Sequence, residues 1–187
     1  MGMSPTRTEW TAGMLNDLPD DGRRYEVIDG QLFVTPAPAD IHQHAVGELY
    51  LLLAPYAKRI GVNLLVAPAA VRFSDRREVQ PDLFATPRMS DGRRPDRFTD
   101  VGVLLLAVEV LSPSTRRTDR TQKRTLYRDE NVADYWIVDT TSRTITHWTP
   151  QSADPDIRSV MVTWQPLPQH APLVIDVVLY FREVFGE

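Results

Sequence analysis

Residues 108–123, VEVLSPSTRRTDRTQK, join an apolar segment that carries one carboxylate to a polar, arginine-rich continuation. The apolar run covers 101–111, and a continuous run of this kind is typical of a strand that is buried on both faces. The polar part has the pattern of a helix, with Thr118 as its expected N-cap and Asn131 at the left-handed stop position. We therefore predict a central strand over 101–111 and a helix over 118–130.

Glu109 lies in the middle of this predicted strand, where a carboxylate is costly unless it is paired, hydrogen-bonded or bound to a metal ion. Asp82 is a candidate partner, because Pro81 before it removes a backbone donor and marks a strand end or edge that can face a cleft. Two carboxylates that converge on adjacent strands repel each other unless a cation lies between them. Oxygen ligands favour Mg²⁺ or Mn²⁺, and without metal the loss of one carboxylate should relieve the repulsion.

Lys123 stands out because it is one of only two lysines among 21 basic residues. It shares a helical face with Leu126 and Tyr127, the large apolar residues of this helix, so its side chain is expected to point inward. Two interpretations are open at this point. A compact ammonium suits a role beside a metal-bound water, or Lys123 simply neutralises Glu109 in a structural ion pair.

The rest of the chain is predicted to alternate between short strands and helices. Asp29–Gly30 is a favoured two-residue turn, which predicts a hairpin over 25–34. Residues 41–54 have the apolar period of an amphipathic helix, which Pro55 should kink or end. Further expected elements are a short capped helix at 4–18, strands at 63–68, 70–73 and 80–86, a loop at 87–100, a hairpin of 134–139 with 144–149, a strand near 159–164 and a closing helix at 177–185.

Composition narrows the class of protein. A length of 187 residues with 42% apolar residues suits one domain over 1–187. The absence of cysteine excludes disulfides, thiolate metal ligands and cysteine nucleophiles, and fits a reducing compartment, so the cytoplasm is the expected location. We find no signal-peptide layout and no apolar run long enough to cross a bilayer. No membrane association is expected.

The formal net charge of −4 argues against a protein that coats nucleic acid through bulk electrostatics. A local basic stretch over 115–128 nevertheless contains six basic residues against one acid. A stretch of this kind is more often a solvated helix face than a groove for nucleic acid.

Four segments in order carry a family resemblance: QPDLF at 80–84, VEVLSPST at 108–115, DRTQKRTLY at 119–127 and ADYWIVD at 133–139. Together with YEVIDGQLFVTPAPADIHQHAVGEL, they resemble the Uma-type family of restriction-endonuclease-like proteins, within the PD-(D/E)xK nuclease superfamily. The resemblance runs from about Arg24 to Trp148. It implies an α/β (α+β) fold with a restriction-endonuclease-like core, in which a mixed central β-sheet is flanked by helices and extended by added hairpins.

The same resemblance implies an active site at Asp82, Glu109 and Lys123. In the wider superfamily the lysine stands two residues after the glutamate, a place that Leu111 holds here. In the Uma-type family the lysine lies on the following helix, as Lys123 does. The implied reaction is hydrolysis of phosphodiester bonds, with DNA as the expected substrate. Asp82 and Glu109 would bind Mg²⁺ or Mn²⁺, while Lys123 would orient or help to deprotonate the attacking water.

Several other residues are candidates for supporting roles. Glu26 matches a recurring glutamate of the family. Three roles are open for it: a further metal ligand, an acid that contacts the metal ligands, or a partner in a surface or structural ion pair. Gln80 and Tyr127 stand inside two of the matching segments. Ser112 binds phosphate or caps the following helix, and capping is the favoured interpretation. The expected contacts to the nucleic-acid backbone are Arg116, Arg117 and Arg120.

Two histidines, His42 and His44, stand two residues apart and so point to different sides of a helix. They do not predict a metal site, although His42 resembles a family position. The implied assembly is a homodimer, since nucleases of this class often pair two sites, with Trp148 as an exposed contact. The alternative function is a catalytically silent nuclease fold that binds nucleic acid or a protein partner. Hydrolysis of another phosphoester is a third hypothesis.

Overall fold

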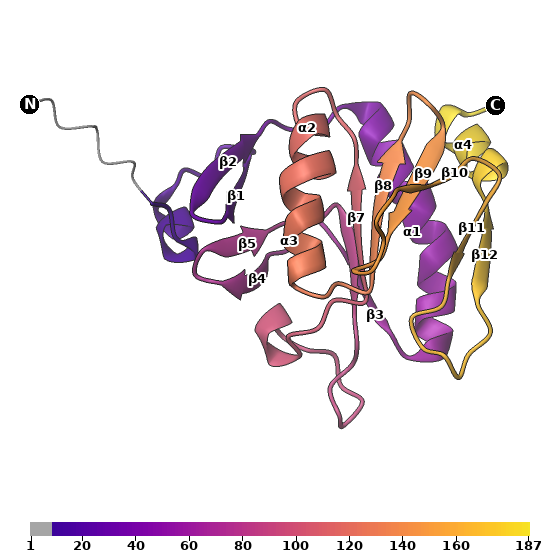
Figure 1. The fold of residues 1–187 in the computed structure, drawn as a ribbon, viewed down its shortest axis with the longest axis horizontal. Coiled ribbons are helices and arrows are strands. Elements are labelled where there is room, and N and C mark those ends of the chain that lie inside the picture. The colour runs from indigo at the N-terminus through magenta and orange to yellow at the C-terminus, as the bar shows by residue number, and fades with distance from the viewer. Residues whose placement is uncertain (1–8) are drawn as a thin grey trace, which may run out of the picture.

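The centre of the computed structural model, which describes residues 9–187, is a six-stranded mixed sheet in the order β10-β9-β8-β7-β6-β3 (Figure 1). Its strands are β3 (Asn63–Val66), β6 (Leu83–Thr86), β7 (Leu106–Val110), β8 (Asp134–Asp139), β9 (Thr144–Trp148) and β10 (Asp156–Arg158). The strands β7 and β8 are parallel, and the other neighbours are antiparallel. The predicted mixed sheet flanked by helices is therefore confirmed.

The predicted central strand is confirmed as β7, and all five of its residues are buried. Alternate side chains enter two hydrophobic clusters. Val108 packs with α1 (Asp40–Ile60) and α4 (Val177–Phe185) on one face, and Ala107 packs with Tyr127 on the other. The strand is shorter than predicted because Gly102 turns the chain at a φ of 62° and Val103 is exposed. Glu109 therefore faces the same side as Ala107.

A second sheet, β2-β1-β5-β4, lies beside the first. It contains β1 (Arg24–Ile28), β2 (Gln31–Thr35), β4 (Val71–Ser74) and β5 (Arg77–Val79). The predicted hairpin is confirmed, and Asp29 and Gly30 have φ values of 49° and 77°, as a type I′ turn requires. Strand β5 was not predicted, because its three residues follow a polar turn and are too few to show an alternation of apolar and polar side chains.

The helix α1 continues past Pro55 to Ile60, so the prediction that it ends near residue 54 is wrong. Proline removes only the hydrogen bond to the carbonyl of Leu51, on the exposed side of the helix where water can replace it. Tyr56, Ala57 and Ile60 are buried beyond the proline, and this packing keeps the last turn helical. Gly61 then ends the helix at a φ of 74°.

The helix after β7 begins at Arg116, so the prediction of Thr118 as its N-cap is wrong. One helical segment runs through α2 (Arg116–Thr118), a π-helical turn η3 (Asp119–Lys123) and α3 (Arg124–Asp129). Thr118 has helical backbone angles, because the chain turns earlier, at residues 112–115. The predicted left-handed Asn131 is confirmed, with a φ of 53°.

The C-terminal part adds β11 (Met161–Trp164), β12 (Leu173–Asp176) and α4. The predicted strand and closing helix are confirmed, whereas β10 and β12 were missed. The Tyr180 hydroxyl donates to the Ala45 carbonyl at 2.8 Å and joins α4 to α1. The 3₁₀ turns are η1 (Ala12–Asp17) and η2 (Phe98–Asp100). The first replaces the predicted helix over 4–18, of which residues 4–8 lie outside the described part.

None of the helices within residues 9–187 combines the length and the apolar character that a membrane span needs.

Candidate active site

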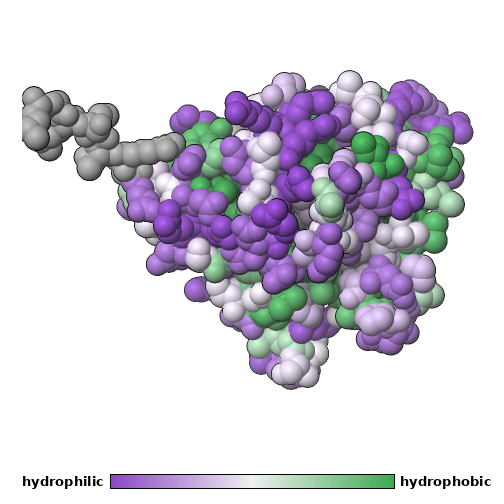
Figure 2. Space-filling view, in the orientation of Figure 1, coloured by the Kyte–Doolittle hydropathy of each residue, from purple (hydrophilic) through white to green (hydrophobic). Residues whose placement is uncertain are grey.

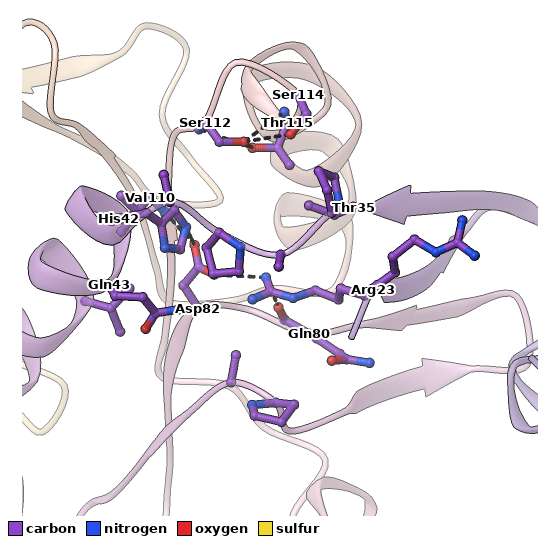
Figure 3. A pocket seen from close by; sticks show the side chains of 18 of the residues that line it. Arg23, Thr35, His42, Gln43, Gln80, Asp82, Val110, Ser112, Ser114 and Thr115 are labelled. Carbon is purple, nitrogen blue, oxygen red and sulfur yellow. Dashed lines mark hydrogen bonds and ion pairs between the residues drawn. The ribbon is translucent and has the colours of Figure 1, made fainter. Parts of the chain in front are cut away.

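A pocket of about 490 Å³ opens at the end of β7, and Asp82 and Glu109 both lie in its wall. Figure 3 shows the pocket with Asp82 among its lining residues. The loop before α1, the first turns of α1 and residues 112–115 form other parts of the wall. Leu83 pairs with Val108 in the antiparallel ladder of β6 and β7. Asp82 and Glu109 therefore stand opposite each other on adjacent strands, which is the predicted placement.

Three donors hold the Asp82 carboxylate. Arg24 donates from Nη1 to Oδ1 at 2.9 Å, and the Val110 N–H donates to Oδ2 at 2.8 Å. The imidazole Nε2 of His42 lies 3.0 Å from Oδ2. Burial favours the neutral acid, but His42, Arg24 and the Val110 N–H outweigh it and lower the pKa of Asp82 to about 2. Asp82 is thus a fixed, ionised carboxylate on the pocket wall.

Glu109 and Lys123 form the second part of the site, on the inner side of the pocket wall. The Lys123 ammonium lies 2.9 Å from Oε1 of Glu109 and 2.9 Å from Oε1 of Glu26. The Tyr127 hydroxyl donates to the same Glu109 oxygen at 2.9 Å. Lys123 is 2% exposed and does not line the pocket. The prediction that Lys123 points inward is confirmed, and its nearest partners are two carboxylates.

The charges of this cluster are unequal, because Asp119 adds a third carboxylate 3.8 Å from the Lys123 ammonium. Burial disfavours the ammonium, but Glu109, Glu26 and Asp119 outweigh it and raise the pKa of Lys123 above its ordinary value. Burial also raises the pKa of Glu109 well above its ordinary value, although the positive charge of Lys123 acts to lower it. Behind the pocket, three carboxyl groups therefore face one ammonium, and burial favours the protonated form of Glu109.

The π-helical turn contributes both Asp119 and Lys123, which stand four residues apart and are both buried. Tyr135 supports this turn by donating from its hydroxyl to the Asp119 backbone carbonyl at 2.9 Å. A π turn widens the helix locally and often lies at a functional site. Leu126 and Tyr127 continue the same inward face in α3, so the helix presents a charged end and an apolar end to the sheet.

Asp119 gives a prediction about stability. Burial raises the pKa of Asp119 to about 6, and its Oδ1 has no hydrogen-bond partner among the described residues. Between pH 4 and 6 the unfolded chain loses this proton while the folded chain keeps it, so stability falls as pH rises through that window. Above pH 7 the cost is about 3 kcal/mol. Asp119→Asn should therefore raise the free energy of unfolding at pH 7.5 by about 2–3 kcal/mol.

Urea denaturation at pH 7.5 and pH 4 measures this effect. The gain should shrink below about 1 kcal/mol at pH 4, where the carboxyl costs little in either state. The exposed Asp154 supplies the control, and Asp154→Asn should change stability little at both pH values. Equal stability of Asp119→Asn and the original chain at pH 7.5 would contradict the prediction.

The chemistry of the donors fits a hard divalent cation. Asp82 and Glu109 offer two carboxylates at one pocket wall, and Mg²⁺ is commonly held by one or two carboxylates together with water and substrate phosphate. Across residues 9–187, no group of three or more histidine, aspartate or glutamate side chains is placed to hold a metal ion. A fully protein-made metal cage is therefore absent from the described part, whereas the two-carboxylate arrangement is present.

Two comparisons with known proteins found matches to this chain. The sequence profile of the Uma2 family, described as "Putative restriction endonuclease", matches residues 13–179. The chain belongs to this family. A crystal structure described as a "putative nuclease belonging to DUF820", from Anabaena variabilis ATCC 29413, has a similar fold, with a TM-score of 0.74 and 19% sequence identity. The match covers 93% of this chain and 98% of that one. No curated protein matches the chain in sequence.

In this Uma2-family chain the predicted backbone-binding arginines do not line the pocket. Arg116 lies 3.3 Å and Arg120 3.0 Å from Oδ2 of Asp139, at the end of β8. Arg117 is exposed outside these pairs. The guanidinium groups of Arg116 and Arg120 remain about half exposed, so contacts to a backbone that passes over α2 stay a prediction.

The remaining predicted residues take separate places. Gln80 lines the pocket, and its backbone N–H donates to Oε1 of Glu26 at 2.7 Å. Glu26 is buried and contacts Lys123, so it lies behind the pocket wall. The Ser112 hydroxyl accepts from the Thr115 N–H at 3.2 Å. This bond closes the turn before the helix, whose N-cap is Thr115 and has no side-chain cap bond, so the capping role of Ser112 stays a prediction.

Arg24 was missed by sequence reasoning, and His42 was noted without a role. Arg24 and Glu26 lie on the same face of β1, so the period of two of a strand, applied to the Glu26 position given by the family resemblance, would also have indicated Arg24. The first turn of α1 carries His42, where a single polar residue on a buried face was the available signal. Neither signal identifies Asp82 as the partner, since the contacts join residues 58 and 40 positions apart.

Proposed function

We propose that this protein is a metal-dependent endonuclease that hydrolyses phosphodiester bonds of DNA. The observation that carries the proposal is the pair Asp82 and Glu109, which stand opposite each other on adjacent strands in the wall of one pocket. Membership of a restriction-endonuclease-like family supports the same reaction class. The proposed metal is Mg²⁺ or Mn²⁺, in keeping with the oxygen ligands.

Each residue of the site has a distinct proposed task. Asp82 and Glu109 would hold the cation, which when bound stabilises charge on the phosphate and promotes ionisation of water. Arg24 from β1 and His42 from α1 hold Asp82 in one orientation. Lys123 from the π-helical turn η3 holds Glu109. Because Lys123 lies behind Glu109, its geometry favours a positioning role through that carboxylate over direct handling of the attacking water.

Nicking of supercoiled plasmid in Mg²⁺ or Mn²⁺ tests the proposal. The original chain and Asp154→Asn should nick the plasmid, while Asp82→Asn and samples with a chelator should not. Metal should also raise the melting temperature of the original chain, because a ligand that binds only the folded state stabilises it. Absence of both the nicking and the metal-dependent shift would reject the enzyme and support the silent-fold alternative.

A specific observation favours that alternative. Arg24, His42 and Lys123 already contact the carboxylates of the site, and a buried cluster of this kind can serve the fold alone. In that case the protein would bind nucleic acid or a protein partner without cleaving it. The plasmid assay and the melting shift distinguish the two functions. A silent fold should show neither metal-dependent nicking nor a metal-dependent rise in melting temperature.

A homodimer remains the predicted assembly, although its proposed contact needs a correction. Trp148 is half-buried, and the Arg124 guanidinium lies 3.6 Å from the centre of its ring. Exposed apolar side chains instead lie in the C-terminal part of the chain, at Val160, Met161, Val174, Val178 and Leu179. Figure 2 shows green, apolar residues gathered at the edge of the molecule where α4 lies. Light scattering should return 42.6 kDa, twice the chain mass of 21.3 kDa. A mass of 21.3 kDa at micromolar concentration would contradict the dimer.

A further inference from the structure

The two proposed metal ligands are recessed. Asp82 and Glu109 are each only 2% exposed, and both line the pocket. A phosphodiester that reacts at these carboxylates must therefore enter the pocket, because it cannot reach them from the outer surface of the protein. The shape and the lining of the pocket consequently limit which form of nucleic acid can react.

The pocket has a volume of about 490 Å³. A base in an intact duplex is paired and stacked, so it can enter such a pocket only when it is unpaired. The volume lies within the range of about 300–1,000 Å³ that encloses a small organic ligand. One nucleotide is a molecule of this size class.

The lining suits the two halves of a nucleotide. Four proline rings from three separate segments form rigid apolar parts of the wall, at Pro36, Pro38, Pro68 and Pro113. The flat face of a base can pack against such surfaces without losing a hydrogen bond. Arg23 and Arg24 lie on the same pocket, and Figure 3 shows the Arg23 side chain extended away from Asp82. The Arg23 side chain is 52% exposed, and its guanidinium pairs with the Asp21 carboxylate, so a phosphate at the entrance would compete with Asp21 for this donor.

We propose that this pocket takes one unpaired nucleotide, with the base against the proline wall and the adjoining phosphate at Asp82 and Glu109. The substrate class is then single-stranded DNA, or a duplex with an unpaired end or flap. This inference rests on the proposed nuclease function. In the reaction, water forms a new bond to phosphorus, the bond from phosphorus to one sugar oxygen breaks, and that oxygen takes up a proton.

The first test compares cleavage of three end-labelled DNAs in Mn²⁺: a single strand, a blunt duplex of the same sequence and a duplex with an unpaired flap. The single strand and the flap should be cut at least about 10-fold faster than the blunt duplex. In the flap substrate the cuts should fall in the unpaired part or at its junction. Equal or faster cleavage of the blunt duplex would overturn the inference while leaving the nuclease function intact.

Binding without metal gives an independent result, measured by fluorescence anisotropy at one fixed salt concentration. The single strand should bind at least about 10-fold more tightly than the duplex. If no DNA is cleaved and metal causes no melting shift, the proposed nuclease function fails, and the anisotropy still decides whether the pocket prefers an unpaired strand. Equal binding of both DNAs would reject that preference.

A pair of variants locates the effect at the pocket. Ala37 is exposed and lines the pocket, so Ala37→Trp should fill part of the space without disturbing the core. Single-strand binding should weaken about 10-fold, whereas the metal-dependent melting shift should stay unchanged. Ala153 is exposed and does not line this pocket, so Ala153→Trp is the matched control. Unchanged single-strand affinity in Ala37→Trp would place the binding site elsewhere and overturn the proposal.

Discussion

Lys123→Met should lower the free energy of unfolding by about 3–5 kcal/mol, the cost of breaking a buried ion pair by removing one partner. The Lys123 ammonium contacts Glu26 and Glu109 at 2.9 Å and lies 3.8 Å from Asp119, and all four side chains are at most 3% exposed. Methionine fills similar volume but leaves three buried carboxylates without their nearest cation. Because total stability of a domain is about 5–15 kcal/mol, the variant should be marginally folded.

Urea denaturation at pH 7.5 measures the loss, and a double variant tests its cause. Glu109→Gln removes one of the carboxylates that lose their cation, so Glu109→Gln with Lys123→Met should recover about 0.5–3 kcal/mol relative to Lys123→Met alone. The deficit of Lys123→Met should also shrink in acid, where the carboxylates take up protons. A variant that unfolds at the same urea concentration as the original chain would show that Lys123 does not hold the cluster together.

The central features of the site were predictable because they depend on local patterns. Glu109 lies in a run too apolar to accept an unpaired carboxylate, and Lys123 lies on the apolar face of the next helix. These two facts place both side chains on the inner side of the same β-α unit. Since residues 14 positions apart make this contact, the chain between them offers few alternative arrangements.

Other features depend on packing between distant segments, which a single sequence does not reveal. Pro55 stays helical because Tyr56 and Ile60 are buried after it. Arg24 and His42 reach Asp82 only because a hairpin and a helix from the first third of the chain both pack at the end of β6. Thr118 has the residue type of an N-cap, yet the Ser112–Thr115 turn starts the helix earlier.

Asp82→Asn and Glu109→Gln should both abolish metal-dependent cleavage but change stability in opposite directions. The pKa of Asp82 falls from 3.8 to about 2 in the folded state, which corresponds to about 2 kcal/mol of stability above pH 4 that is lost as pH falls toward 2. Asparagine retains one acceptor oxygen where the carboxylate uses both, so one of the donors Arg24 or His42 would face an amide N–H₂. The structure thus reverses the expectation that losing this carboxylate relieves repulsion.

Glu109→Gln has a different local result, because Oε1 of Glu109 accepts from both Lys123 and Tyr127. A glutamine oxygen can keep both bonds, and the substitution removes a buried charge whose pKa burial raises. With a chelator at pH 7.5, urea denaturation should therefore show a free energy of unfolding about 2 kcal/mol lower for Asp82→Asn. Glu109→Gln should be at least as stable as the original chain. Plasmid nicking in Mn²⁺ should fall on the order of 10²-fold or more in both. Destabilisation of Glu109→Gln as large as that of Asp82→Asn would refute the asymmetry, and normal nicking by either variant would remove that carboxylate from the proposed metal site.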